Sequence, residues 1–132
     1  MSPQELSFRA RKKNELHELC DRLLVEDSKA VEECVAFLEA ETFGIWHGRA
    51  RAMMARRLKH RTLSASQRER LNRAVLGRLA SGRFSEGFRD QLRLILHLDP
   101  ERAFSAARVC QGNAADHVRR YATWVLAHER KP

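Results

Sequence analysis

Four arginines recur near the starts of predicted helices, at spacings of 40, 40 and 30 residues: Arg9, Arg49, Arg89 and Arg119. The local strings are SFRAR, HGRAR, GFRDQ and HVRRY, and an apolar helical pattern directly follows the last three. A helix-start motif that returns at such intervals is typical of stacked helical hairpins. The repeat therefore predicts an all-α chain, folded as an α-solenoid of about three hairpins plus a terminal helix.

Apolar residues spaced three and four apart predict seven helices. We expect the first over residues 4–25 and the third over 44–61. The helices pair as hairpins over about residues 4–41, 44–81 and 85–111, and the terminal helix, over 114–129, is left without a mate. Because no linker or low-complexity segment interrupts the series, we expect a single domain over residues 1–132.

Capping residues mark several helix boundaries. Ser64 or Ser66 can cap the fourth helix, which is expected to end near Gly82. The string Asp99-Pro100-Glu101 is a strong start signal for the sixth helix, because Asp caps, Pro fits the first turn and Glu favours the helix dipole. The fifth and seventh helices are expected to open at Ser85 and Asn113.

Each predicted helix has one apolar face that we assign to the core. These residues are Leu16, Leu19, Leu23, Val31, Cys34, Val35, Leu38, Trp46, Ala50, Met53, Met54, Leu58, Leu71, Ala74, Val75, Leu79, Phe88, Leu92, Ile95, Leu96, Ala103, Ala107, Cys110, Val118, Ala122, Val125 and Leu126. Arg57 and Arg78 project into sectors that we assign as apolar. Either the helical phases are slightly shifted, or the stems of these arginines are buried with polar partners.

Several functional classes find no support in the sequence. No long apolar run predicts a membrane span, and the polar string MSPQELSFRARKKNE predicts no secretory signal. Cys20, Cys34 and Cys110 lack C-x-x-C spacing and are expected to be buried, reduced thiols of a cytoplasmic protein. Zinc-protease, phosphate-loop and nucleophile-elbow motifs are absent. We therefore expect no enzyme, no cofactor and no metal site.

The stretch from Asp116 to Leu126, DHVRRYATWVL, resembles the opening helix of a HEAT or HEAT-like (armadillo-type) repeat. Such repeats often begin with an acidic residue, then Val-Arg, and continue with small and apolar residues at helical spacing. Glu86-Gly87-Phe88-Arg89 is a weaker copy, and Trp46-His47-Gly48-Arg49 keeps the arginine without the acid. The resemblance covers about residues 42–129 and implies a helical-repeat fold.

The resemblance also implies roles for two sets of residues. In HEAT repeats, the arginine after Val commonly pairs with an acidic residue of the neighbouring repeat. Arg49, Arg89 and Arg119 would then form a structural ladder with Glu86 and Asp116. The second helix of each hairpin usually lines the inner, concave surface, so those helices are the better place to look for a binding site.

The net charge of +8 is concentrated in one part of the chain. Residues 1–41 carry 6 basic and 10 acidic side chains, residues 42–83 carry 11 and 1, and residues 84–132 carry 8 and 6. A basic field confined to the central hairpin can steer an acidic partner. The alternative is a solvated, arginine-rich surface without a specific partner.

Four arginines on the second helices form the candidate contact set for a partner: Arg70 and Arg73 on the fourth helix, and Arg102 and Arg108 on the sixth. They lie opposite the apolar faces of their helices. We therefore expect a non-enzymatic scaffold or adaptor that binds a protein partner through an acidic segment. The alternatives are a nucleic-acid-binding protein, using the central Arg-rich hairpin on DNA or RNA, and a plain solvated face.

His117, Tyr121, Trp124 and His128 form a stripe on the terminal helix. Three interpretations compete: the stripe folds back on the sixth helix as ordinary core, it forms an interface for self-association or a partner, or it stacks bases or holds a ligand. Because the terminal helix lacks a hairpin mate, we expect homodimerisation through Tyr121 and Trp124. A longer repeat array would explain the same open end.

Overall fold

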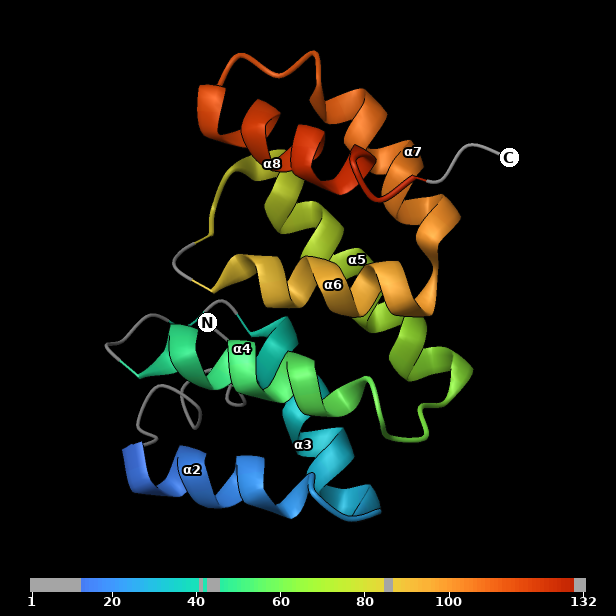
Figure 1. Ribbon diagram of the computed structural model, residues 1–132. Coiled ribbons are helices and arrows are strands. Elements are labelled where there is room, and N and C mark those ends of the chain that lie inside the picture. Colours follow the sequence, from blue (N-terminus) through green and yellow to red (C-terminus); the bar gives the residue numbers. More distant parts are fainter. Residues whose placement is uncertain (1–12, 41, 43–45, 85–86, 130–132) are drawn as a thin grey trace.

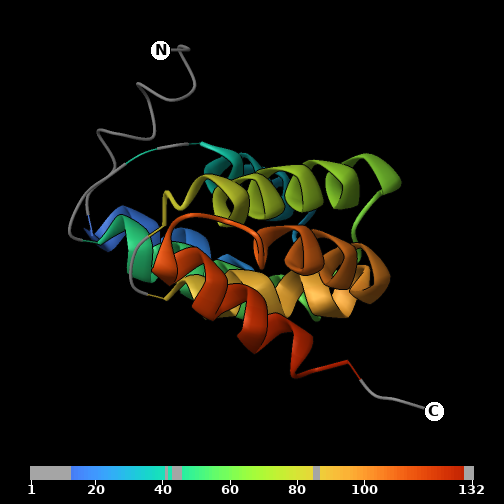
Figure 2. The same cartoon turned by 90° about the horizontal axis from the view of Figure 1, so that it is seen from above.

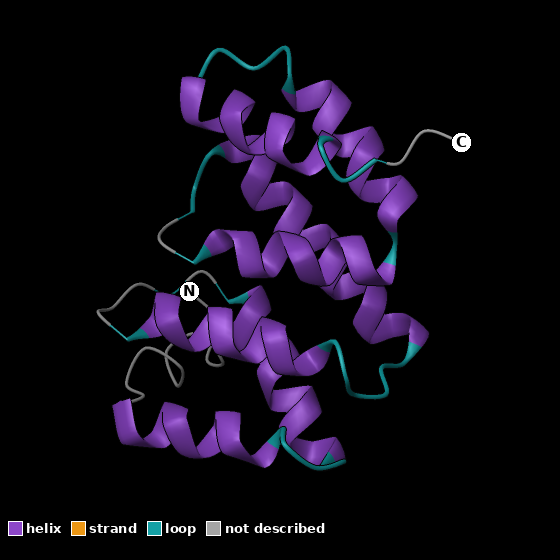
Figure 3. Cartoon of the chain, viewed as in Figure 1, coloured by secondary structure: helices purple, strands orange, loops and turns teal. Residues whose placement is uncertain are grey.

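The computed structural model describes residues 13–40, 42, 46–84 and 87–129. Within these ranges the chain forms seven helices and no strand, as Figure 3 shows. The helices are α2 (Lys13–Arg22), α3 (Ser28–Glu39), α4 (His47–Leu58), α5 (Ala65–Ser81), α6 (Phe88–Leu98), α7 (Pro100–Cys110) and α8 (Asp116–Leu126). The predicted all-α class is confirmed. No helix in the described part has the length and apolar character needed to cross a bilayer.

The helices lie in two rows (Figures 1 and 2). One row, which we call the front row, contains α2, α4, α6 and α8, each packed against the next. The back row contains α3, α5 and α7, and α5 packs against both of its neighbours there. Helices that follow one another in the chain alternate between the rows, and α7 and α8 make one of the most extensive contacts across them.

A continuous cluster of buried apolar side chains lies between the rows and includes residues from all seven helices. Every residue that the apolar pattern assigned to the core is buried or half-buried. The pattern missed Phe37, which is completely enclosed and is among the largest buried side chains. Removal of this apolar surface from water supplies the main driving force for bringing the rows together.

The helix boundaries that depend on caps agree well with expectation. Ser64, rather than Ser66, caps α5, and it forms a reciprocal capping box with Gln67. The same helix ends at Gly82, whose φ of +74° lies in the left-handed region that glycine adopts without strain. Asp99 caps α7 by accepting from the backbone N–H of Arg102, and Pro100 occupies the first turn.

The terminal helix is shorter than expected and begins at Asp116, three residues after Asn113. The side chain of Asn113 accepts a hydrogen bond from the N–H of Ala115 (2.8 Å) and donates one to the carbonyl of Ala80 (3.2 Å). These bonds hold the preceding segment in a turn, which competes with helical geometry. The helix ends at Leu126 rather than near residue 129.

Other expectations fall partly outside the described residues. This holds for residues 4–12 of the first predicted helix, for Gly44 at the start of the third and for the expected cap Ser85. It also holds for Arg9 of the arginine repeat and for Glu86 of the implied ladder. In the described part, α4 ends at Leu58 instead of Arg61.

Candidate functional site

The acidic amino-terminal segment and the basic central segment pair with each other in the fold. Arg57 of α4 donates to Asp21 of α2 (3.1 Å), and Arg61 lies 3.8 Å from Glu26 in the following loop. Exposed ion pairs of this kind contribute little individually. Several arginines of the central segment nevertheless pair with carboxylates of the same chain, so their charge is partly neutralised within the fold.

Arg70, the first of the predicted partner-binding residues, is held by two glutamates of α3. It donates to both carboxylate oxygens of Glu32 (2.8 and 2.9 Å) and twice to Oε1 of Glu39 (2.8 and 2.6 Å). The bonds from Arg70 lower the pKa of Glu32, and the bonds to Glu32 and Glu39 raise the pKa of Arg70. The fork of this guanidinium therefore joins α5 to α3.

The other three predicted contact residues also pair with glutamates of the same chain. Arg102 of α7 donates to Glu69 of α5 and thereby lowers the pKa of that carboxyl. Arg108 pairs with Glu129. Arg73 also reaches Glu69 (3.3 Å), but its side chain is 76% exposed, the most open of the four. The back row thus presents glutamates of α3 and α5 between its arginines.

In the described part of the chain, Arg49, Arg89 and Arg119 contact aromatic rings or groups close to them in the chain. Arg49 lies over the ring of Trp46, with its Cζ 5.3 Å from the ring centre. Arg119 donates to Asp116 of its own helix (3.4 Å) and to backbone carbonyls just before that helix. Arg89 lies over rings of α8. Of the two acids that the HEAT resemblance implies for a ladder, Asp116 bonds to Arg119 of its own helix, and Glu86 lies outside the described residues.

Pairing between front-row helices uses two other arginines. Arg56 and Arg57 are consecutive on α4, and they reach in opposite directions: Arg56 donates to Asp90 of α6 (2.7 Å), and Arg57 donates to Asp21 of α2. The Arg57 side chain is only 23% exposed. Of the two explanations for its place in an apolar sector, the buried stem with a polar partner is correct.

Two more arginines lie inside the protein, around the carbonyl of Ala40 at the end of α3. Arg51 donates to that carbonyl (2.7 Å) and to Thr42 Oγ1 (2.6 Å). Arg78 donates to the same carbonyl (3.3 Å) and to Gln91 (3.1 Å). Both arginines are 7% exposed. This buried polar centre connects α3 to α4, α5 and α6, and it satisfies the end of a helix whose dipole favours cations.

A groove of about 630 Å³ lies along the surface where α2 packs against α4, and it extends to the start of α6. We call it the α2–α4 groove. Its apolar lining consists of Leu16, Cys20, Trp46, Ala50, Ala52 and Met53. Its cations are Lys13, Arg49, Arg56 and Arg57, and its carboxylates are Asp21 and Asp90. The groove therefore combines an apolar floor with an excess of positive charge.

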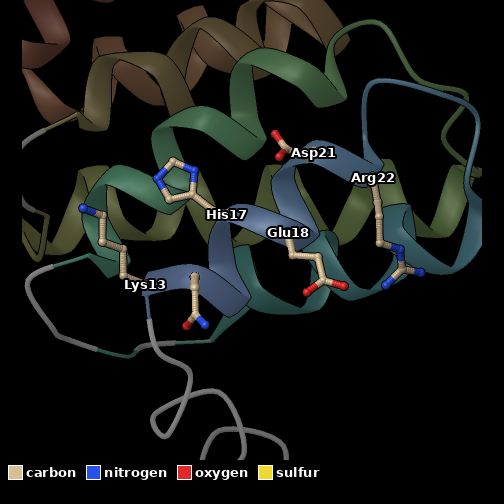
Figure 4. Close-up of a pocket in the computed structure, with 6 residues that line it drawn as sticks. Lys13, His17, Glu18, Asp21 and Arg22 are labelled. Carbon is tan, nitrogen blue, oxygen red and sulfur yellow. The ribbon is translucent and has the colours of Figure 1, made fainter.

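Trp46 is the aromatic side chain of the groove, and two cations lie on its ring. Lys13 Nζ is 4.1 Å and Arg49 Cζ is 5.3 Å from the ring centre. Figure 4 shows Lys13, His17 and Asp21 on the side of α2 that faces α4, while Glu18 and Arg22 extend away from it. The cationic and apolar groups of α4 therefore face a wall of α2 that carries both signs of charge.

The thiol in the groove is not activated as a nucleophile. Cys20 lines it, but burial raises the pKa of its thiol to about 11, so the sulfur stays protonated and is a poor nucleophile. The thiol points to the backbone carbonyl of Ala50 (3.9 Å). Among the described residues, no three His, Cys, Asp or Glu side chains gather in a way that could hold a metal ion. This arrangement is suited to binding.

The stripe on α8 packs within the chain. Tyr121 contacts the rings of Phe84 and Phe88, with centroids 4.7 and 5.9 Å apart, and His117 donates to the carbonyl of Gly82 (3.0 Å). Trp124 meets His128 edge to face at 4.5 Å. The stripe therefore folds back on α6 and the residues before it. The sequence placed a packed stripe on α7, whereas the ring contacts of Tyr121 lie with Phe88 of α6 and with Phe84 before it.

Sequence reasoning assigned Trp46 and Met53 to the core, and both are in fact half-buried at the groove. The available signal was a tryptophan and two methionines among the arginines of one helix, which carries no carboxylate. Comparison of the chain with protein-family models, with curated proteins and with solved structures finds no match. The site is therefore interpreted from its own chemistry.

Proposed function

We propose that the protein is a non-enzymatic scaffold, folded as a right-handed, HEAT-like α-solenoid, that binds an acidic segment of a protein partner in the α2–α4 groove. The alternation of the helices between two rows supports the solenoid. The groove carries the functional part of the proposal, because its apolar floor and its four cations lie together on two packed helices.

The chemistry of the groove favours a peptide that combines a large apolar side chain with carboxylates. Met53, Cys20 and the edge of Trp46 offer a soft, apolar surface that can accommodate different side-chain shapes. Lys13 and Arg49 lie beside this surface and can meet carboxylates on either side of the buried side chain. An amphipathic helix or an extended segment could supply both kinds of contact.

A nucleic acid fits this groove less well than a peptide. Asp21 and Asp90 stand on its walls and would lie close to any phosphate bound by Arg56 or Arg57. Its floor is mainly aliphatic and sulfur-containing, whereas base recognition relies on flat aromatic faces. A protein segment can place its carboxylates away from the two aspartates.

Peptide display on the full-length chain tests this proposal. We expect a random library to yield peptides with one large apolar residue flanked by Asp or Glu. The charge reversal Arg49→Glu should weaken the selected peptides by at least about tenfold, equivalent to about 1.4 kcal/mol, because it places a carboxylate beside those of the ligand. Fluorescence anisotropy of a labelled selected peptide measures this loss.

The matched control is Arg73→Glu, which makes the same change on the back row, also at an exposed side chain. It should leave the affinity within about twofold, since exposed charges far from the ligand are screened. If Arg73→Glu removed binding while Arg49→Glu did not, the partner would bind the back row, and the groove would lose its role. Selected peptides without acidic residues would also contradict the proposal.

A further inference from the structure

The front row carries a second cluster of charged and aromatic side chains, between α6 and α8. Arg89 of α6 lies over two rings of α8, with Cζ 5.7 Å from the centre of Tyr121 and 5.6 Å from that of Trp124. Arg93, one turn further along α6, lies over the same Trp124 ring at 5.3 Å. We call Arg89, Arg93, Tyr121 and Trp124 the α6–α8 ring cluster.

Neighbouring aromatic side chains hold the two rings of this cluster in place. Tyr121 packs against Phe84 and Phe88, and His128 meets Trp124 edge to face. The docking of α8 also uses residues outside the cluster, since Val118, Ala122 and Val125 are the side chains that it buries. Trp124 is only half-buried, and Arg89 and Arg93 are exposed, so the upper layer of the cluster lies outside the core.

The charges around this cluster differ from those of the α2–α4 groove. Among the described residues, Asp90 contacts it with a carboxylate that is 16% exposed and already bound to Arg56 (2.7 Å) and Arg93 (3.2 Å). A guanidinium that lies on a ring directs its N–H groups outward along its edge, where they can bind an oxyanion. The cluster thus offers flat aromatic faces and outward-pointing cationic donors at one place.

We propose that the α6–α8 ring cluster binds single-stranded nucleic acid. One or two unpaired bases would stack on the faces of Trp124 and Tyr121, and the arginines would move from the rings to the neighbouring phosphates. Aromatic platforms beside cations are the usual means of binding single strands without sequence preference. A duplex hides the faces of its bases and can make only the phosphate contacts.

This site uses the other tryptophan of the chain, and it meets the peptide groove at Asp90, which lines the groove and binds Arg93. The chain has two tryptophans, so the Trp46→Phe variant leaves Trp124 as its sole indole. Titration of that variant with an oligothymidylate or an oligouridylate at low salt should quench the indole fluorescence. Unchanged fluorescence, or an absence of binding to either oligonucleotide, would overturn the proposal.

Variants in the cluster separate stacking from charge. In anisotropy titrations with the labelled oligonucleotide, Trp124→Ala should weaken binding by about tenfold, and Trp124→Phe should restore most of it. Arg89→Gln should weaken binding and make the salt dependence shallower, by about 0.7 in the slope of log K against log salt. Arg73→Gln, on the back row, should make neither change.

Three outcomes would contradict the proposal. Binding of a duplex of the same sequence as tightly as the single strand would exclude base stacking. Trp124→Ala could lower the melting temperature while leaving oligonucleotide affinity unaltered, which would make the cluster a packing device alone. Competition between an acidic peptide and the oligonucleotide for Trp124 would assign the surface to a protein. Circular dichroism of each variant checks that the fold is retained.

Discussion

Replacing Arg51 with methionine is expected to lower the free energy of unfolding by about 3 kcal/mol, because breaking a buried charged interaction strands its partners. The guanidinium donates to the carbonyl of Ala40 and to Thr42, and it lies 4.9 Å from the ring centre of Phe37. Methionine keeps much of the apolar stem but supplies no donor. Urea denaturation followed by circular dichroism measures the loss.

The control for this prediction is Arg57→Met, the same substitution six positions along the same helix. The partner of Arg57 is Asp21, whose side chain is 65% exposed and can be hydrated when the pair is broken. We expect this variant to lose less than about 1 kcal/mol. Equal losses in the two variants would mean that the buried polar centre is no more important than a surface ion pair.

Replacing Phe88 with alanine is expected to cost about 3–5 kcal/mol, the usual range for deleting a buried phenylalanine. The side chain is 1% exposed at the start of α6. Its ring stacks on Phe84 with centroids 4.3 Å apart and contacts Tyr121 of α8. The resulting cavity would therefore weaken both α6 and the attachment of α8 to the front row.

Two measurements check the Phe88 prediction. Urea denaturation should show the loss of stability, and hydrogen exchange should show faster exchange at the amides of α8 than at those of α3. Val109→Ala is the control, since that side chain is 80% exposed and its change should stay within about 0.5 kcal/mol. If amide exchange in α8 stayed at its original rate, Phe88 would not be the anchor of that helix.

Helix positions could be predicted from the sequence where a local rule determines them. Asp99 and Pro100 open α7, and Ser64 and Gly82 delimit α5, because each residue acts on backbone groups within a few positions. The start of α8 could not be predicted in this way. The side chain of Asn113 bonds to Ala80, which is distant in sequence, and this contact delays the helix.

The candidate site was harder to predict, because charge in a sequence does not say which charges meet. The excess of arginine in residues 42–83 indicated a basic surface, yet Arg70 bonds to glutamates 38 and 31 positions earlier. Arg51 gave no signal at all: it stands in an arginine-rich helix and is nevertheless buried. Both facts depend on the packing of helices from different hairpins.

The same limit applies to Trp46 and Trp124. Their helical spacing marks them as packing residues, and both do pack on the front row. Only the arrangement of the helices shows that each also carries two cations on its ring, from Lys13 and Arg49 in one case and from Arg89 and Arg93 in the other. Both tryptophans therefore form cation–aromatic contacts on the front row.

Amide chemical-shift mapping of the full-length chain, titrated with an acidic peptide selected by display, tests the central claim most directly. The account predicts that the shifted amides lie on α2 and α4 and at the start of α6, around Trp46, Met53 and Arg49. It also predicts that α3, α5 and α7 stay largely unchanged. Shifts centred on Arg70, Arg73 and Arg102 of the back row would contradict the account and return the binding surface to the second helices of the hairpins.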